Sequence, residues 1–395
     1  GGREINLNIA VIPAISRDPA PDPLFLFAGG PGQAATETYV QLSFAFERIN
    51  QKRDIILIDQ RGTGKSNPLD CTQGIVTEEG ISDDEQVLEH IRSCLDSLEA
   101  DPRLYTTPVA MQDIDQVRAA LGYEKINLYG VSYGTRAALT YLQMFPEQVR
   151  AVILDGVVPQ DEPLGLDVAR DAQQALDLIF SRCEQDAACS QAFPNVRQEF
   201  ATLLETLKTD PVEITLPHPT SGRQMTVTFT VDEMAAAIRL LTYAPETAAL
   251  LPLLIHQTAS QEDFNLLAAQ YLIVSESLVE SISEGMNYSV ICTEDYPFIL
   301  PEAAARANQG TYLGESQIEG LKQICDIWPA GDLPEGFHQP VRSDVPVLLL
   351  SGEADPVTPP GNAAAVAETL PNSLNLIAAG QGHNIVYRGC IPNVI

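Results

Sequence analysis

Short apolar runs alternate with amphipathic stretches over the first 158 residues of the chain. Four of the runs have the length of buried strands: 23–28, 54–59, 125–130 and 149–155. Residues 109–121 have helical spacing and stop at Gly122, and residues 133–145 form a second amphipathic stretch. Strands that alternate with helices predict a mostly parallel sheet joined by right-handed crossovers.

The beginning of the chain has the period of a strand. Ile5, Leu7, Ile9 and Val11 alternate with other residues, which predicts a half-buried strand with these four side chains on its apolar face. A chain that begins inside a strand looks like a mature or trimmed product. The lack of a leader segment therefore says little about export.

From about residue 160 the apolar positions follow a helical period. Three long helical stretches and a possible hairpin follow: the helices at 167–183, 231–244 and 246–259, and the hairpin at 212–231. A buried-strand pattern returns near residue 345, and a helix and a further strand come after it. The simplest architecture is a discontinuous α/β core of residues 1–159 and 341–395, with a mainly helical cap of residues 160–340 inserted between core strands.

The charge of the chain excludes two classes of partner. Its 395 residues include 53 acidic and 23 basic ones, which gives a formal net charge of −30. Such a surface repels phosphate backbones and anionic lipid, so neither a nucleic acid nor a membrane is an expected partner. No apolar run approaches the roughly 18 residues of a membrane span.

Seven cysteines are present, and no two have the CxxC spacing of a zinc ribbon or a thioredoxin-like site. Seven buried thiols in a cytosolic enzyme are one interpretation, but the spacing favours disulfides and an oxidising compartment. Pairing by order leaves Cys390 over and gives three disulfides: Cys71–Cys94, Cys183–Cys189 and Cys292–Cys325.

One serine stands between two glycines in the segment GVSYGT, after a predicted strand and before a predicted helix. In that context the motif predicts a nucleophile elbow, in which Gly130 and Gly134 relieve crowding and Ser132 is held exposed at the helix N-terminus. The alternative is a small residue in a tight turn. The position between strand and helix favours Ser132 as a nucleophile.

A serine nucleophile needs a base, and five histidines are available. His383 lies in the glycine-rich segment AAGQGHNIV, directly after a predicted strand, where a loop can carry the imidazole over the sheet edge. His90, His218, His256 and His338 lie in helical, proline-flanked or connecting segments, where surface or structural roles are expected. His383 is therefore the predicted base.

The base needs a carboxylate that fixes its tautomer. Asp355, in the segment GEADPVTP after a buried strand, and Asp155, at the end of an earlier strand, both fit the chain order serine, aspartate, histidine. Asp355 is favoured because it follows the strand nearest His383. The other interpretation of Asp155 is a structural turn carboxylate.

Two backbone N–H groups are expected to form an oxyanion hole: that of Tyr133, and that of Gly30 in the loop FAGGPGQ. A plain turn is the alternative for the loop. The segment DQRGTGKS ends like a phosphate-binding loop. It has Asp59 where that motif needs glycine, which excludes a nucleotide-binding loop here. No metal-ligand spacing appears, so neither a metal nor another cofactor is expected.

Taken in order, GGPG, DQRGTGKS, GVSYGT, DGV, GEADPVTP and GH resemble the motifs of the prolyl-aminopeptidase and tripeptidyl-aminopeptidase group of α/β-hydrolase serine peptidases. The resemblance covers nearly the whole chain and is nearer to the tripeptidyl-aminopeptidase-like branch, because of the cysteines in VICTEDYP and ICDIWP. It departs from many prolyl aminopeptidases in having AGGPG where they have HGGPG. It implies an α/β-hydrolase fold, with a mostly parallel central sheet flanked by helices and a large helical cap. It also implies a Cys292–Cys325 bridge and a partner of Cys390 lost by trimming.

The resemblance further implies a secreted or periplasmic serine exopeptidase, which cleaves short peptides near their free N-terminus through an acyl-enzyme. A substrate ammonium needs carboxylates, and Glu294 first, with Asp295, matches the acidic position after the family's cysteine. A solvated acidic pair is the other interpretation. A carboxylesterase or lipase would use the same triad on small esters, whereas a non-catalytic hydrolase-fold binding protein would lack one of its members.

Overall fold

A seven-stranded sheet forms the centre of the molecule in the computed structural model, which describes residues 4–71, 76–77, 80–81 and 84–395. The strand order across the sheet is β1-β3-β2-β6-β7-β10-β11. These strands are β1 (Ile9–Ile12), β2 (Leu24–Phe27), β3 (Ile55–Ile58), β6 (Ile126–Val131), β7 (Val149–Asp155), β10 (Val347–Gly352) and β11 (Ser373–Ala378). All neighbouring pairs are parallel except β1 with β3, which confirms the expected mostly parallel sheet.

Both faces of the sheet are covered, which explains the uninterrupted apolar runs of its central strands. One face packs on α4 (Thr107–Ala120), α5 (Tyr133–Met144) and α16 (Pro360–Ala367). The other face packs on α1 (Ala35–Leu42) and on the C-terminal residues 385–395. The carboxyl ends of the parallel strands meet at one edge of the sheet, where ligands bind in open α/β folds.

The N-terminal strand is shifted in phase from the expected one. Ile9 and Val11 are 40% and 44% exposed, whereas Ala10 and Ile12 pack against the core of the sheet. The predicted apolar face is therefore wrong for Ile9 and Val11, whereas Leu7, which precedes β1, is half-buried and packs on the apolar cluster of the opposite face. Asn8 faces the same way as Ala10 and Ile12, and its side chain donates a hydrogen bond of 2.7 Å to the buried carboxylate of Asp59, directly after β3.

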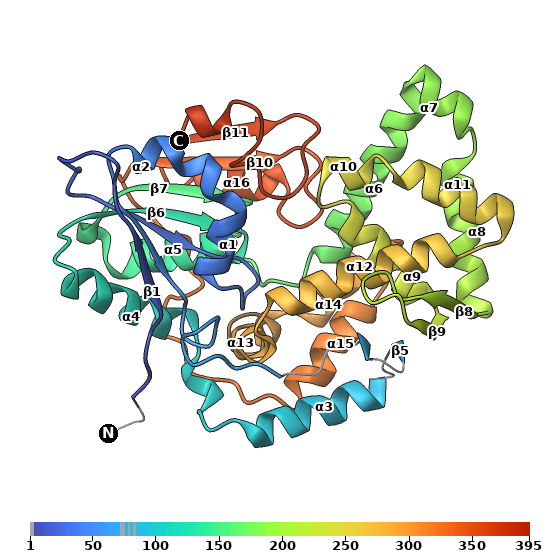
Figure 1. Ribbon diagram of the computed structural model, residues 1–395, viewed down its shortest axis with the longest axis horizontal. Helices are drawn as coiled ribbons and strands as arrows, with labels where there is room; N and C mark the ends of the chain where they lie inside the picture. The colour runs from blue at the N-terminus through green and yellow to red at the C-terminus, as the bar shows by residue number, and fades with distance from the viewer. Residues whose placement is uncertain (1–3, 72–75, 78–79, 82–83) are drawn as a thin grey trace.

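A mainly helical cap stands beside the sheet, on the right of Figure 1. Its helices and hairpin strands are α6 (Val168–Gln185), α7 (Ala187–Ala192), α8 (Val196–Thr209), β8 (Val212–Pro217), β9 (Gln224–Phe229), α9 (Val231–Leu241), α10 (Pro245–Ala248), α11 (Leu251–Gln261) and α12 (Asn265–Ser281). The expected hairpin and the expected helices of residues 167–183 and 231–244 are confirmed, whereas the helix expected over residues 246–259 is divided into α10 and α11. A capping box of Thr230 and Glu233 begins α9.

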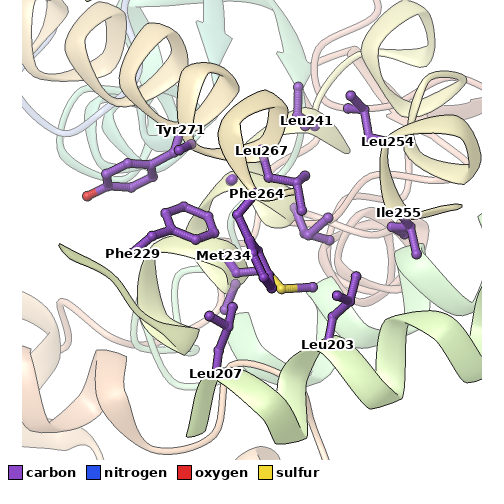
Figure 2. Packing of buried hydrophobic residues seen from close by; sticks show 14 of the residues in the cluster. Leu203, Leu207, Phe229, Met234, Leu241, Leu254, Ile255, Phe264, Leu267 and Tyr271 are labelled. Atoms are coloured by element: carbon purple, nitrogen blue, oxygen red, sulfur yellow. The ribbon is translucent and has the colours of Figure 1, made fainter. Parts of the chain in front are cut away.

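The cap has an apolar core of its own, separate from the two clusters that pack on the sheet. Side chains from β9 and from the helices of the cap point toward one another in Figure 2: Leu203, Leu207, Phe229, Met234, Leu241, Leu254, Ile255, Phe264, Leu267 and Tyr271. Burial of these side chains stabilises the fold of the cap independently of the core of the sheet. The cap can therefore hold its helix ends near the sheet edge without sharing the core of the sheet.

Two segments pack across the expected boundary between core and cap. Met286 and Val290 of α13 (Glu284–Val290) contact Tyr105 and Tyr133 of the core. Conversely, α3 (Asp84–Ser97), which belongs to the expected core, packs on the expected cap at Ile324 and Cys325 of α15 (Ser316–Cys325). Between these lie the π-helical turn η4 (Ile291–Asp295) and α14 (Pro301–Asn308). The boundaries of the two domains stay a prediction.

All three expected disulfides are present, with Cα separations of 5.0 to 5.3 Å. The bridge Cys292–Cys325 joins η4 to α15. Cys390 is exposed and is not bonded to any cysteine of the described ranges. Among the helices that the structure describes, every one is too short or too polar to cross a lipid bilayer.

Candidate active site

Ser132 occupies the sharp turn between β6 and α5. Its backbone has φ 56° and ψ −126°, a region that residues with a side chain rarely adopt. The Ser132 N–H group donates to the carbonyl oxygen of Asp155 at 2.8 Å, and the Thr135 hydroxyl donates to the carbonyl oxygen of Ser132 at 2.7 Å. These hydrogen bonds hold the strained turn in the expected context between strand and helix.

The two glycines of the motif are required by close backbone contacts. A Cβ atom on Gly130 would lie 2.2 Å from the carbonyl oxygen of Gly134, and a Cβ atom on Gly134 would lie 2.2 Å from the carbonyl oxygen of Phe27. Both distances are far below van der Waals contact. Glycine therefore lets α5 pack closely on β2 and β6, which fixes Ser132 at the N-terminus of the helix.

His383 and Asp355 contact each other directly. His383 Nδ1 lies 2.8 Å from Asp355 Oδ2 and 3.0 Å from Oδ1. Both residues are buried, and His383 lines the same cavity as Ser132. With Nδ1 on the carboxylate, Nε2 is the ring nitrogen available to a serine hydroxyl. Asp355 and His383 are thus in contact near the carboxyl-terminal edge of the sheet, on the cavity that Ser132 also lines, and their action as a triad with Ser132 stays a prediction.

Asp355 is itself held by residues that follow it closely. The Thr358 hydroxyl donates to Oδ2 at 2.7 Å, and the N–H groups of Val357 and Thr358 donate to Oδ1 at 2.8 and 2.9 Å. Burial raises the pKa of Asp355, but His383 and Thr358 outweigh burial and hold the pKa below its ordinary value. The sequence reasoning missed Thr358, although an Asp-x-x-Thr turn after a strand is a local signal for such hydrogen bonds.

Asp155, the other candidate for the carboxylate of the triad, binds the backbone of the loop that carries His383. Its oxygens accept the N–H groups of Ile385 at 2.8 Å and Val386 at 2.9 Å, and the Tyr129 hydroxyl at 3.1 Å. Burial raises its pKa to about 6 despite these donors. The geometry favours Asp355 as the partner of the His383 ring and gives Asp155 a structural role.

Ser132 and His383 line a cavity of about 650 Å³ between the sheet edge and the cap. The glycine loop after β2 forms one wall, since a Cβ atom on Gly29 would lie 3.3 Å from the Ser132 Cβ. Gly30, with φ 105°, lines the same cavity. Tyr133 is the first residue of α5, so its N–H group has no acceptor within the helix. The N–H groups of Gly30 and Tyr133 stay the predicted oxyanion donors.

The cap contacts the histidine loop directly. The carbonyl oxygen of Tyr243, just beyond α9, accepts the His383 N–H group at 2.8 Å. The Tyr243 ring also packs edge-on against the imidazole, with the ring centroids 5.4 Å apart. The sequence reasoning missed Tyr243, because the contact joins two segments far apart along the chain.

Glu294 is fully buried and is not among the described residues that line the cavity. Its carboxylate accepts the Thr107 N–H group at 2.5 Å and the Thr107 hydroxyl at 2.7 Å. That hydroxyl also lies 2.6 Å from the Tyr133 hydroxyl, so Glu294 braces the residue after the candidate nucleophile. Burial, with Asp295 nearby, raises the pKa of Glu294 to about 8. Its contact with a substrate ammonium stays a prediction.

Asp295 forms a fully buried ion pair with Arg136 of α5. The same carboxylate oxygen accepts the Leu164 N–H group at 2.7 Å. Burial raises the pKa of Asp295 although Arg136 opposes this shift. The pair attaches η4 to the helix that begins at the candidate nucleophile, and it leaves Asp295 away from the described cavity lining.

One group of potential metal ligands lies among the described residues: Cys71, His90 and Glu284. Because Cys71 is bonded to Cys94, its sulfur is not a thiolate. A thiolate, rather than a disulfide sulfur, is the ligand that metals take from cysteine. The group therefore gives no support for a metal centre.

The chain is similar to known hydrolases. A family model described as alpha/beta hydrolase fold matches residues 22–201, and one described as TAP-like protein matches residues 310–395. The putative hydrolase YuaR of Escherichia coli K12 is 23% identical over 94% of this chain and 76% of that protein. The serine protease Hip1 of Mycobacterium bovis is 24% identical over 94% of this chain and 77% of that protein. The tripeptidyl aminopeptidase of Streptomyces lividans is 33% identical over 33% of this chain and 27% of that protein. These matches confirm the expected fold.

Proposed function

We propose that this chain, which belongs to the α/β-hydrolase family, is a serine exopeptidase that cleaves short peptides near their free N-terminus through an acyl-enzyme. The observation that carries the proposal is the 2.8 Å contact of His383 Nδ1 with Asp355 Oδ2, on a cavity shared with an elbow serine. Relatives named serine protease and tripeptidyl aminopeptidase support a peptidase.

In the proposed reaction, the Ser132 oxygen attacks the carbonyl carbon of the scissile amide while its proton passes to His383 Nε2. The carbon–nitrogen bond then breaks as His383 gives that proton to the leaving amine, which leaves an ester on Ser132. Water attacks the ester, and His383 again takes a proton and returns it to the serine oxygen. Asp355 keeps the proton of Nδ1 in place and stabilises the imidazolium.

The oxyanion that forms at the scissile carbonyl is assigned to the N–H groups of Gly30 and Tyr133. The close approach of the Gly29 backbone to Ser132 supports this assignment for the glycine loop. The start of α5 at Tyr133 supports it for the second donor, because the first N–H groups of a helix point at an incoming anion. Loss of one such donor costs about 3–4 kcal/mol of transition-state stabilisation.

A substrate ammonium needs a carboxylate that it can reach. Glu37 of α1 lines the cavity and is exposed, and no other described residue of the lining is an aspartate or a glutamate. Glu294 is buried and hydrogen-bonded to Thr107. We therefore assign the first ammonium contact to Glu37, and the role of Glu294 stays a prediction to be tested against it.

The expected location is outside the cytosol, as a secreted or periplasmic protein. Three disulfides within the described residues support this proposal, since such bonds persist in oxidising compartments. The net charge of −30 is the reason why neither a nucleic acid nor a membrane is expected as a partner, and this stays a prediction.

The proposal is tested with matched substrates: peptides with a free N-terminus, the same peptides acetylated, and short-chain nitrophenyl esters. We expect kcat/KM for free peptides to exceed that for acetylated ones by at least about tenfold, the size of one charge-assisted contact. Hydrolysis of the esters alone would support a carboxylesterase instead. Equal cleavage of free and acetylated peptides would contradict the exopeptidase assignment. The Ser132→Ala variant provides the background rate.

A further inference from the structure

Arg239, near the end of α9, carries a guanidinium that no feature of the proposed mechanism uses. It lines the cavity that holds Ser132 and His383. No other described residue of the cavity lining is an arginine or a lysine. Within the described part of the chain its side chain makes no hydrogen bond or ion pair, and its Nε is buried without a partner. A cation without a counter-ion is available to an anion, in a protein with 53 acidic residues and 23 basic ones.

Two ring contacts connect Arg239 to the candidate base. The guanidinium carbon lies 5.5 Å from the centroid of the Tyr243 ring, and that ring lies 5.4 Å from the His383 ring. The guanidinium carbon is therefore no more than about 11 Å from the centre of the imidazole, the sum of these two distances. The guanidinium lies over the Tyr243 ring, and the N–H edge of a guanidinium is the part that binds a carboxylate.

The position of Arg239 on the cavity wall, separated from the base by Tyr243, indicates which part of a substrate it meets. His383 gives a proton to the leaving amine, so the leaving fragment must begin beside the imidazole. An extended peptide advances about 3.3–3.6 Å per residue. A C-terminal carboxylate that ends one to three residues beyond the scissile bond therefore falls within reach of Arg239.

We propose that Arg239 binds the α-carboxylate of the leaving fragment, so that the enzyme selects peptides whose free C-terminus lies one to three residues beyond the scissile bond. This inference rests on the proposed function and names its substrate class more closely. A guanidinium pairs with a carboxylate through two parallel hydrogen bonds, which gives both strength and orientation. Glu37 and Arg239 then recognise opposite ends of one short zwitterionic peptide.

The test compares kcat/KM for peptides that differ only in a free or an amidated C-terminus, with leaving fragments of one to five residues. For fragments of one to three residues, wild type is expected to prefer the free acid by at least about tenfold. The preference disappears for five residues. In Arg239→Gln the ratio of kcat/KM for the free acid to that for the amide falls to near one. Arg239→Lys keeps part of the preference, because lysine retains the charge but lacks the planar pair of N–H donors.

Arg306→Gln is the matched control, because Arg306 is an exposed arginine of α14 that is not among the described lining residues. It removes the same charge from the cap and is expected to keep the wild-type ratio of acid to amide. A wild-type ratio near one for short leaving fragments overturns the proposal. So does an Arg239→Gln ratio equal to that of wild type.

A binding measurement separates this inference from the proposed function. Calorimetry with the Ser132→Ala protein compares di-alanine with its C-terminal amide, and needs no turnover. Tighter binding of the free acid, lost in Ser132→Ala/Arg239→Gln, supports the carboxylate site even if wild type hydrolyses only esters and the peptidase proposal fails. Equal binding of acid and amide overturns the site even if peptides are cleaved.

Discussion

The carboxylate of Asp155 accepts the N–H group of Ile385 at 2.8 Å, which ties the end of β7 to the loop that carries His383. Asp355 contacts the His383 ring itself, also at 2.8 Å. Two aspartates at neighbouring strand ends thus support one histidine in different ways. One holds the backbone of its loop, and the other holds its ring.

Substitution of each aspartate by asparagine separates these two roles. Asp355→Asn is expected to lower kcat by about 10³–10⁴-fold with little loss of stability, because the amide cannot hold the tautomer or stabilise the imidazolium. Asp155→Asn is expected to lower the free energy of unfolding by about 1–3 kcal/mol, since one buried backbone donor loses its acceptor, with a smaller effect on kcat. Steady-state peptide hydrolysis and urea unfolding measure both effects. The reverse ranking of the two variants would contradict the assignment of Asp355.

Glu294 predicts a specific dependence of stability on pH. The folded protein holds its proton up to about pH 8, whereas the unfolded chain releases it near pH 4.3. Between these values the folded state binds one more proton, so its stability falls as the pH rises, by up to about 1.4 kcal/mol per pH unit. This stability is fully present below the lower value and is lost as the pH passes the higher one.

Glu294→Gln removes that proton and keeps groups that can pair with Thr107. Urea unfolding between about pH 6.5 and 8 should give a flatter slope for the variant than for wild type. The window lies above the pKa of about 6 of Asp155, whereas burial raises the pKa of Glu284 to about 7, so the difference between the two slopes, and not either slope alone, reports Glu294. Parallel stability curves for the two proteins would mean that Glu294 is ionised throughout this range.

The ammonium contact is tested by Glu37→Gln beside Glu294→Gln. If Glu37 on the cavity wall binds the substrate ammonium, Glu37→Gln raises KM for free peptides by about tenfold and leaves the rate for acetylated peptides unchanged. Glu294→Gln should then affect both substrates alike, because it acts through Thr107 and Tyr133. If Glu294→Gln weakened the hydrolysis of free peptides alone, Glu294 would be the residue that binds the substrate ammonium.

Gly134 is the glycine whose replacement should disturb the elbow most directly. The added Cβ of Gly134→Ala meets the Phe27 carbonyl oxygen at 2.2 Å, so we expect a loss of about 1–3 kcal/mol or more of unfolding free energy. Gly320→Ala is the control, because nothing lies within 4 Å of its added Cβ in α15, and it should gain about 0.5–1 kcal/mol. Thermal unfolding of both variants measures the difference. Equal stability would show that β2 and α5 can separate without cost.

The parts of the site that the sequence could predict lie on loops directly after strands. Ser132, Asp355 and His383 each follow a predicted strand of a parallel sheet, and the ends of such strands meet at one edge, so their proximity follows from the topology. The disulfides followed from order along the chain. The phase of β1 did not follow, because β1 is an edge strand whose inward side chains, Ala10 and Ile12, are no more apolar than the outward Ile9 and Val11.

The parts that the sequence could not predict depend on how the cap packs on the core. Tyr243 and Arg239 lie near the end of α9, and nothing in their own segment indicates that α9 ends against the histidine loop. The burial of Glu294 depends on η4 packing beside the start of α4, which joins residues 187 positions apart. Acidic residues after a cysteine suggest a binding site in sequence, but their hydrogen bonds decide whether they face a ligand.

Whether Ser132 forms a covalent intermediate is measured by peptide mapping with mass spectrometry after treatment with a fluorophosphonate. We expect one phosphonate per chain, on Ser132, with peptide hydrolysis lost in parallel. We expect no adduct in Ser132→Ala, whose kcat falls by several orders of magnitude although it folds. Peptide hydrolysis that continues without an adduct on Ser132, or near-normal turnover by Ser132→Ala, would show that Ser132 is not the nucleophile.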